Sequence, residues 1–198
     1  MGLFSEKIDL NLPESEISYY SNFLKTENAS AYFKILKSKV PWQQDKIKVF
    51  GKTYDQPRLT ALYGNNDKAY SYSNIVMRPH EFTPELLQIK SFVEKEAEME
   101  FSTCLLNYYR NGKDSNGWHA DDEKELGQNP VIASISLGAE RIFHLRNKKD
   151  KLLKHKIVLE HGSLLLMAGE TQHKWHHKIA KTSKNIGERI NLTFRIIK

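Results

Sequence analysis

The stretch Arg189-Ile190-Asn191-Leu192-Thr193-Phe194-Arg195-Ile196 alternates polar and apolar side chains without a break. Successive side chains of an extended chain point to opposite faces, so the alternation predicts a β-strand. One face of this strand would be apolar, and the other would carry Arg189, Asn191, Thr193 and Arg195. Two guanidinium groups beside an amide and a hydroxyl can clamp a dicarboxylate, because a guanidinium binds a carboxylate through two parallel hydrogen bonds. Taken alone, the pattern is also typical of an amphipathic surface strand, so the clamp needs support from elsewhere.

Similar short strand patterns fill the second half of the chain. Strands are expected at residues 101–109, 131–137, 141–145, 156–159, 163–167 and 189–197. Turn residues such as Asn111-Gly112, Gly138 and His161-Gly162 separate them. Many short strands at close spacing predict a sandwich or jelly roll.

The first half of the chain predicts helices and a few extended segments. Apolar residues in 13–40 fall at helical spacing, which predicts two short helices with a break near Asn28 and Ser30. Residues 47–74 contain two aromatic-rich extended segments separated by Pro57. Thr83 precedes Pro84 and is expected to cap a helix that runs to about residue 98. We therefore expect an α+β protein that is mostly β, with residues 1–198 in a single domain.

Composition limits the class of protein and the kind of partner. The chain has 198 residues, of which 39% are hydrophobic and 27% are charged, so a disordered chain and a coiled coil are excluded. Its only cysteine, Cys104, excludes a disulfide framework and a four-cysteine zinc site. A net charge of +6 favours polyanionic partners such as nucleic acid, although an ordinary basic protein can have the same composition.

Sequence features also give expectations about location and assembly. No run of 18 apolar residues occurs, and the first residues lack the pattern of a secretory signal. We therefore expect a monomer in the bacterial cytoplasm, or in the nucleus of a eukaryote, with no membrane partner.

A second group of residues suggests a metal site. In His119-Ala120-Asp121 an imidazole and a carboxylate lie two residues apart, so an extended chain places them on one side. With one distant histidine they would form the two-histidine, one-carboxylate set of non-haem iron(II) oxygenases. By itself the His-x-Asp pair is a weak signal that often arises by chance.

Three later histidines, His173, His176 and His177, can supply the third ligand. Any one of them could instead be a solvated loop residue. Their position between the His-x-Asp pair and the strand with two arginines strengthens the metal hypothesis. Upstream, Asn107 and Tyr109 share a strand face and could bind the same small acid.

These motifs together resemble the AlkB family of iron(II)- and 2-oxoglutarate-dependent dioxygenases. The resemblance covers roughly residues 45–198 and rests on four motifs that occur in the same order as in the family. They are Asn107-Tyr108-Tyr109, His119-Ala120-Asp121-Asp122-Glu123, the segment 132–138 and Arg189 to Arg195. The Asp-Asp-Glu run after the first histidine is closest to the branch that repairs alkylated bases in duplex DNA.

The resemblance implies a fold and a set of ligands for Fe(II), with O2 and 2-oxoglutarate as cosubstrates. The fold would be a double-stranded β-helix at about residues 99–198, preceded by helices and a nucleotide-recognition lid in about residues 1–98. His119 and Asp121 match the first two metal ligands, and counting twelve residues back from Arg189 selects His177 as the third. The residues that match the 2-oxoglutarate contacts are Asn107, Tyr109, Arg189, Asn191, Thr193 and Arg195. Arg189 would pair with the distal carboxylate.

The resemblance also implies contacts with DNA. Phe50, with Gly51 and Lys52, is similar to a finger hairpin that fills the gap left by a flipped base, whereas the residues alone suit a core aromatic. The other matched or candidate substrate contacts are Arg58, Tyr70, Ser71, Tyr72, Asp122 and Glu123. Further candidates for phosphate contacts are Lys148, Lys149, Lys151 and Lys184.

The implied reaction is repair of bases such as N1-methyladenine and N3-methylcytosine, in which formaldehyde is released and 2-oxoglutarate becomes succinate and CO2. Three alternatives stay open from the sequence. The substrate could be RNA or single-stranded DNA, the protein could be a non-catalytic β-barrel module that binds nucleic acid, or the metal site could hold structural zinc. The donor set favours iron over zinc.

Overall fold

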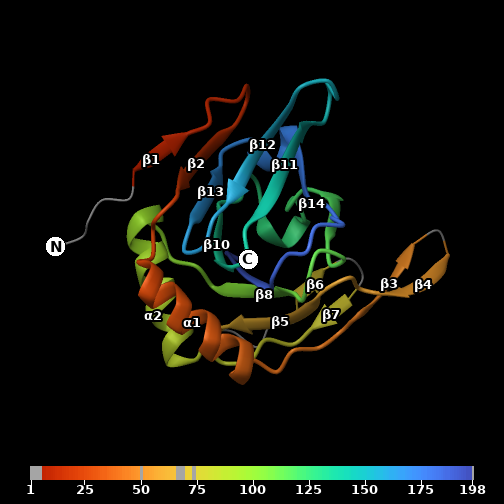
Figure 1. The fold of residues 1–198 in the computed structure, drawn as a ribbon. Coiled ribbons are helices and arrows are strands. Elements are labelled where there is room, and N and C mark those ends of the chain that lie inside the picture. Colours follow the sequence, from red (N-terminus) through yellow and green to blue (C-terminus); the bar gives the residue numbers. More distant parts are fainter. Residues whose placement is uncertain (1–5, 50, 66–69, 73–74, 198) are drawn as a thin grey trace.

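Two antiparallel sheets pack face to face in the computed structural model, which describes residues 6–49, 51–65, 70–72 and 75–197 (Figure 1). Within these residues, the major sheet has seven strands in the order β1-β2-β13-β10-β15-β8-β5. Their bounds are β1 Lys7–Asp9, β2 Glu16–Tyr20, β13 Leu164–Ala168, β10 Ile132–Gly138, β15 Arg189–Arg195, β8 Thr103–Tyr109 and β5 Leu59–Gly64.

The minor sheet, as far as the structure describes the chain, has four strands in the order β12-β11-β14-β9. Their bounds are β12 Lys154–Leu159, β11 Arg141–Asn147, β14 Trp175–Ile179 and β9 Asn116–His119. Two facing antiparallel sheets joined by crossing connections form a jelly roll, as the sequence predicts.

Two hairpins and the helices lie outside these sheets. The hairpins are β3 Lys46–Val49 with β4 Lys52–Asp55, and β6 Tyr70–Tyr72 with β7 Ile75–Met77. The helical segments are α1 Thr26–Lys39, α2 Pro84–Ala97, α3 Thr171–Lys174 and the single turn η1 Lys124–Leu126. Helices α1 and α2 lie together against the major sheet, and the β3–β4 hairpin projects on another side (Figure 1). No helix in the described part of the chain combines the length and apolar character needed to span a bilayer.

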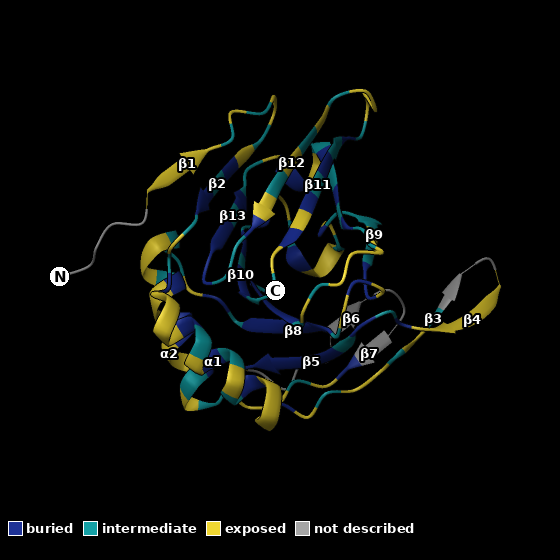
Figure 2. Ribbon diagram, in the orientation of Figure 1, coloured by how far each residue is buried: buried dark blue, intermediate teal, exposed yellow. Residues whose placement is uncertain are grey.

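The core has two compartments, one on each side of the major sheet. One compartment packs helix residues such as Leu36 and Ile89 against Leu192 and Phe194 of β15. The other lies between the sheets and contains Trp175. Figure 2 shows β8 and β5 as buried strands, whereas β1, β4 and the outer sides of the helices are exposed. Strand β15 is buried on both faces, so its polar face points into the interior and is not a surface.

The structure confirms the expected β-rich class and most strands of the second half, and it corrects the first half. Residues 16–20 form a strand, not a helix, because β2 pairs with both β1 and β13. Asn28 and Ser30 lie inside one continuous helix, α1, and do not break it. Helix α2 begins as expected, since the Thr83 side chain accepts a hydrogen bond from the Leu86 backbone N–H. The expected boundary near residue 98 stays a prediction, although the major sheet takes strands from both sides of it.

Candidate active site

His119, Asp121 and His177 converge between the two sheets. His119 ends β9 and lies opposite His177 in the pairing of β9 with β14, while Asp121 follows in the next bend. One potential ligand atom from each residue lies within 4.8 Å of the other two. Pairing between neighbouring strands thus brings together ligands that are 58 positions apart in the sequence.

Hydrogen bonds orient the His119 ring toward this centre. The Nδ1 atom lies 2.8 Å from the Gly117 carbonyl oxygen, and the Asn116 amide nitrogen lies 3.2 Å from Nε2. In a neutral imidazole, Nδ1–H then donates to Gly117 and Nε2 accepts from Asn116. That tautomer puts the free lone pair of the ring on Nε2, 4.0 Å from Asp121 Oδ1, and a metal bound there would replace the Asn116 hydrogen bond.

Asp121 is a buried carboxylate held by two neighbours. Its Oδ1 accepts a hydrogen bond of 2.7 Å from Arg195 Nη2, and its backbone N–H donates to the Gln172 side chain over 2.9 Å. Burial alone would raise the pKa of Asp121, but the Arg195 charge and the two histidines bring it below its ordinary value. The carboxylate is therefore ionised at neutral pH and available as a ligand.

His177 is held neutral by its surroundings. Its ring stacks on Phe143 with centroids 5.1 Å apart, and the side chain is buried. Burial, followed by the nearby His119, lowers the pKa of His177 well below its ordinary value. By contrast, His176 alternates to the other face of β14, and His173 is exposed on α3 next to the Asn129 backbone. The geometry selects His177 among the three histidines.

The donor set fits Fe(II). Two neutral imidazoles and one carboxylate on one side of a centre leave other positions open, which is the arrangement of non-haem iron(II) oxygenases. Structural zinc sites usually close the shell with four protein ligands. Within the described residues, His119, Asp121 and His177 are the one group of this kind.

A pocket beside these ligands is lined by the polar face of β15. Arg189 is buried here, and its Nη2 donates to Ser136 Oγ over 2.9 Å. Its Nε and Nη1 are also buried, but neither has a hydrogen-bond partner among the described residues. Burial lowers the pKa of Arg189 to about 10, with Tyr109 acting in the opposite direction. A buried guanidinium with two unused N–H groups fits the distal carboxylate of 2-oxoglutarate.

The other expected acid contacts line the same pocket, as the strand registers require. Asn107 lies opposite Asn191, and Tyr109 lies opposite Arg189, in the pairing of β8 with β15. Asn191 donates to Ser134 Oγ over 2.7 Å and accepts from Thr193 Oγ1 over 3.0 Å. These two side chains therefore already satisfy part of each other's hydrogen bonding, and their contact with the cosubstrate stays a prediction.

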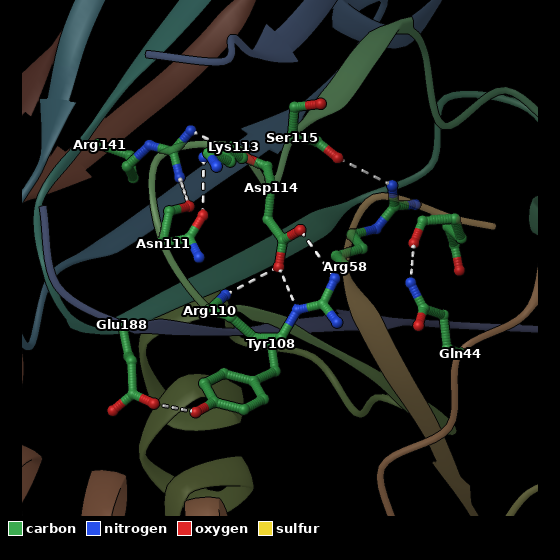
Figure 3. Close-up of polar contacts among 11 residues, drawn as sticks. Gln44, Arg58, Tyr108, Arg110, Asn111, Lys113, Asp114, Ser115, Arg141 and Glu188 are labelled. Carbon is green, nitrogen blue, oxygen red and sulfur yellow. Dashed lines mark hydrogen bonds and ion pairs between the residues drawn. The ribbon is translucent and has the colours of Figure 1, made fainter. Parts of the chain in front are cut away.

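The loop between β8 and β9 is anchored by arginines (Figure 3). Arg110 donates to both carboxylate oxygens of Asp114, at 2.8 Å from Nε and 3.0 Å from Nη2. Arg141 Nη2 donates to the Asp114 carbonyl oxygen over 3.0 Å, and Arg58 Nη1 donates to that of Ser115 over 3.3 Å. The loop leads directly into β9, so these contacts set the position of His119.

Arg58 is a correction to the expected phosphate contacts. Its side chain is buried, and its Nε donates to Asn107 Oδ1 over 2.6 Å. The guanidinium therefore lies beneath the surface, where it joins a pocket residue to the β8–β9 loop. Arg58 directly precedes β5, and this burial could not be predicted because it depends on the pairing of β5 with the distant strand β8.

The expected DNA contacts of the two hairpins lie at an exposed turn or outside the described residues. Phe50 lies outside them, and Gly51 and Lys52 are exposed where the β3–β4 hairpin turns. Tyr70, Ser71 and Tyr72 form β6, but their side chains are outside the described part. Their roles stay predictions.

Two acidic residues follow the metal ligands. Asp122 is exposed and accepts a hydrogen bond of 2.7 Å from Lys148 Nζ. Glu123 is partly buried, and its Oε2 has no hydrogen-bond partner in the described part of the chain. Burial and then the Asp121 charge raise the pKa of Glu123. The other candidates for phosphate contacts, Lys149, Lys151 and Lys184, are exposed.

Several side chains that support the site were not predicted from the sequence. Gln172 accepts a hydrogen bond from the proposed metal ligand Asp121, and Phe143 stacks on His177. Ser134 and Ser136 accept hydrogen bonds from Asn191 and Arg189, the proposed cosubstrate contacts. The alternation in 132–138 could have indicated the two serines, because Ser134 and Ser136 share one strand face. Nothing in the sequence around Gln172 distinguishes it from a solvated amide.

Comparison with known proteins identifies the family. The model of the 2OG-Fe(II) oxygenase superfamily matches residues 16–195. The chain is 41% identical over 192 residues to the Bos taurus protein "Alpha-ketoglutarate-dependent dioxygenase alkB homolog 3", covering 92% of this chain and 66% of that protein. It is 36% identical over 211 residues to the Arabidopsis thaliana "DNA oxidative demethylase ALKBH2", covering 92% of this chain and 67% of that protein.

Other matches agree with this result. The Homo sapiens "DNA oxidative demethylase ALKBH2" is 34% identical over 192 residues, which cover 92% of this chain and 73% of that protein. A solved structure, described as "The structure of OsALKBH1", superposes with a TM-score of 0.70 at 17% identity, covering 96% of this chain and all of that one. This structural similarity, at low sequence identity, supports the assignment of the fold alone. The chain spans about two thirds of the length of the alkB homolog 3 relatives. It belongs to the AlkB-type proteins of the 2OG-Fe(II) oxygenase superfamily.

Proposed function

We propose that this protein demethylates alkylated bases in DNA, such as N1-methyladenine and N3-methylcytosine. In this reaction 2-oxoglutarate becomes succinate and CO2, and the methyl group leaves as formaldehyde. The observation that carries the proposal is an iron-type donor set beside the buried guanidinium of Arg189, whose Nε and Nη1 have no hydrogen-bond partner among the described residues. Two relatives whose printed name is "DNA oxidative demethylase ALKBH2" support DNA as the substrate.

The residues of the site would divide the work of the reaction. His119, Asp121 and His177 would hold Fe(II), which with O2 and 2-oxoglutarate supplies the oxidation. Arg189 would bind the distal carboxylate of 2-oxoglutarate and so fix its orientation. Arg195 keeps Asp121 ionised and oriented through the hydrogen bond to Oδ1. Arg189, Arg195, Asp121 and His177 are buried between the sheets, and burial strengthens these electrostatic contacts.

The target base must leave the double helix to reach this pocket. We propose that the β3–β4 hairpin supports this step, with Phe50 entering the stack and Lys52 near the backbone. Tyr70 and Tyr72 would contact the flipped nucleotide, with Asp122 and Glu123 near the base. A cationic methylated base would be favoured by these carboxyl groups. A monomer in the cytoplasm or nucleus is the form that we expect to act on DNA.

A first experiment tests the dioxygenase activity. Anaerobic addition of Fe(II) and 2-oxoglutarate should produce a weak visible charge-transfer band, and admission of O2 with methylated DNA should release formaldehyde and succinate in equal amounts. The His119→Ala variant, prepared and treated in the same way, is the control and should show neither the charge-transfer band nor the release of formaldehyde and succinate. Binding of methylated DNA without any turnover would instead support the non-catalytic binding module.

A second experiment tests the preference for duplex DNA. If Phe50 fills the gap left by a flipped base, Phe50→Ala should lower repair of a duplex much more than repair of the same lesion in a single strand. A stacking contact of about 1–3 kcal/mol corresponds to roughly a 5- to 150-fold effect. Equal losses on both substrates, together with a lower melting temperature, would assign Phe50 to the core. If the parent protein turns over methylated RNA or single-stranded DNA faster than methylated duplex DNA, the preferred substrate is that nucleic acid and not the duplex.

A further inference from the structure

The outer face of the minor sheet is strongly basic. Side chains alternate along each strand, and the inward set includes Phe143 and His177 at the active site. The outward set comprises Trp118, Ile142, His144, Arg146, Lys154, Lys156, Val158, His176 and Lys178. We call this set the outer basic face. It has four permanent positive charges, and no acidic side chain projects from these described strand positions.

Strand pairing places these charges in rows. His144 of β11 lies between Lys178 of β14 and Lys156 of β12, and Arg146 lies opposite Lys154. Neighbouring strands are about 4.8 Å apart, and alternate residues along a strand are about 6.6 Å apart. The cations therefore form a grid on one side of the sheet, and Lys154 and Lys156 of β12 are exposed to solvent.

An aromatic ring organises part of the grid. The guanidinium carbon of Arg146 lies 4.3 Å from the centroid of the Trp118 ring, and Lys178 Nζ lies 4.5 Å from it. Cation–π contacts of this kind hold the two charges in place without neutralising them. The Arg146 Nε atom is buried and has no hydrogen-bond partner among the described residues.

The four permanent positive charges of this face have no ion-pair partner among the described residues. In the described part of the chain, no salt bridge involves Arg146, Lys154, Lys156 or Lys178. Burial, and then Lys178 and Lys156, lower the pKa of His144, which agrees with an uncompensated positive field. A cluster of like charges is unfavourable unless an anionic partner covers it.

The face begins next to the active site. Trp118 directly precedes the proposed metal ligand His119 on β9, which is an edge strand of the minor sheet. From there the charges run across β14 and β11 to β12. At the far side, the face borders a hollow lined by Ile142, Val158, Lys181 and Lys184.

From this arrangement we infer that the outer basic face binds the phosphate backbone of a nucleic-acid strand that continues beyond the base in the active site. This inference rests on the proposed nucleic-acid substrate and adds a second contact surface to it. The repeated cations match a polyanion of regular charge spacing, and the face reads no base sequence. Contacts of this kind position a nucleic acid and make its binding depend on salt.

The test replaces two exposed lysines far from the metal ligands. The double variant Lys154→Gln, Lys156→Gln is compared with Lys34→Gln, Lys95→Gln, which removes the same charge from exposed positions of α1 and α2. Binding of unmodified single-stranded and duplex DNA is measured by fluorescence anisotropy over a range of salt concentrations, without Fe(II). Circular dichroism melting checks that both variants fold.

If the face binds phosphates, the slope of log K against log salt should fall in magnitude by about 1.4 for a single strand and about 1.8 for a duplex. The control variant should keep the slope of the parent. Equal slopes in all three proteins would overturn the inference while leaving the dioxygenase activity untouched, because that activity is measured separately by release of formaldehyde. A loss of binding to poly-glutamate with unchanged binding to DNA would also overturn it and would assign the face to an acidic protein.

Discussion

Arg195 Nη2 donates a hydrogen bond of 2.7 Å to Asp121 Oδ1, and both side chains are almost fully buried. The two residues are 74 positions apart and come from β15 and from the bend after β9. The contact connects the strand that would hold the cosubstrate to a proposed metal ligand. A substitution at the cosubstrate site should therefore affect the metal site, and a substitution at the metal site should affect the cosubstrate site.

Arg195→Met should strongly destabilise the metal-free protein. The substitution leaves the Asp121 carboxylate buried without its cation, which typically costs on the order of 3–5 kcal/mol in free energy of unfolding. Denaturation by urea measures this loss. Lys148→Met breaks a more exposed pair with Asp122 and should cost only about 0–1 kcal/mol. Equal effects of the two substitutions would show that the buried pair has no special role.

Arg189→Met should weaken binding of 2-oxoglutarate but should not weaken the fold. It removes a buried charge of which two nitrogens have no hydrogen-bond partner in the described part of the chain, so the free energy of unfolding of the metal-free protein should stay level or rise. The affinity for 2-oxoglutarate should fall by on the order of 2–4 kcal/mol, or roughly 30- to 1,000-fold. Calorimetric titration into the anaerobic Fe(II) protein measures the affinity.

Arg141→Met is the control for this substitution. Arg141 also lies over the Tyr109 ring, but it donates to the backbone oxygens of Asp114 and Ala180. Its loss should lower stability and leave those acceptors unsatisfied. An unchanged affinity for 2-oxoglutarate in Arg189→Met would remove Arg189 from the clamp.

His177→Ala should abolish tight binding of metal, and His176→Ala should not. His177 points between the sheets toward His119, with ring centroids 4.2 Å apart, while His176 lies on the outer basic face. The loss for His177→Ala should exceed the roughly 10- to 100-fold effect of losing an outer hydrogen-bond partner of a ligand. Anaerobic titration with Fe(II) measures it, and retained affinity in His177→Ala would reassign the third ligand.

Asp114→Asn should lower stability at neutral pH and make stability less sensitive to acid. Burial would raise the pKa of Asp114, but hydrogen bonds and charge from Arg110 bring it below the ordinary 3.8. A carboxyl with a lowered folded pKa stabilises the fold above its unfolded pKa, and this contribution is lost as the pH falls through the folded pKa. The variant should lose roughly 1–3 kcal/mol at pH 7 and show a shallower decline below pH 3.8.

Asp55→Asn provides the comparison for Asp114→Asn. Asp55 is exposed in β4 and pairs with Lys46, whose side chain is also exposed. Its substitution should leave the free energy of unfolding at pH 7, and the decline of that free energy at acid pH, close to those of the parent. If the free energy of unfolding of Asp114→Asn and that of the parent decline in parallel at acid pH, the Arg110 contact is excluded as the cause of the decline.

Gly138→Ala should destabilise the protein because its backbone has φ of +90° and lacks room for a side chain. An added Cβ would lie 2.4 Å from the Glu188 carbonyl oxygen and 2.7 Å from the Phe33 ring. The strained backbone alone costs on the order of 1–3 kcal/mol. Gly117→Ala, where no atom lies within 4 Å of the added Cβ, should change the melting temperature little. Equal melting temperatures for the two variants would contradict the explanation that backbone strain and lack of room at Gly138 cause the destabilisation.

The polar face of β15 could be predicted from sequence because side-chain direction in a strand depends on the local backbone. Alternation placed Arg189, Asn191, Thr193 and Arg195 on one side, and all four line the pocket. The same argument brought Asn107 and Tyr109 to one face of β8. The cap at Thr83 is equally local, since a side chain and a backbone N–H three residues apart decide it. The count to His177 relied on the resemblance to a known family, and the geometry now supports it.

Pairings between segments far apart in the sequence determine the features of the fold and the site that could not be predicted. Residues 16–20 have helical spacing, but hydrogen bonding to β13 makes them a strand, because a place in a sheet outweighs weak local preference. Arg58 has the sequence setting of a surface cation and is buried only because β5 lies against β8. The outer basic face exists only once β12, β11, β14 and β9 lie side by side. Which side chains share a strand face could be predicted from the chain, since that follows from local backbone geometry. Which faces pack together and which meet water depends on contacts between residues far apart along the chain, so these features appear only in the folded protein.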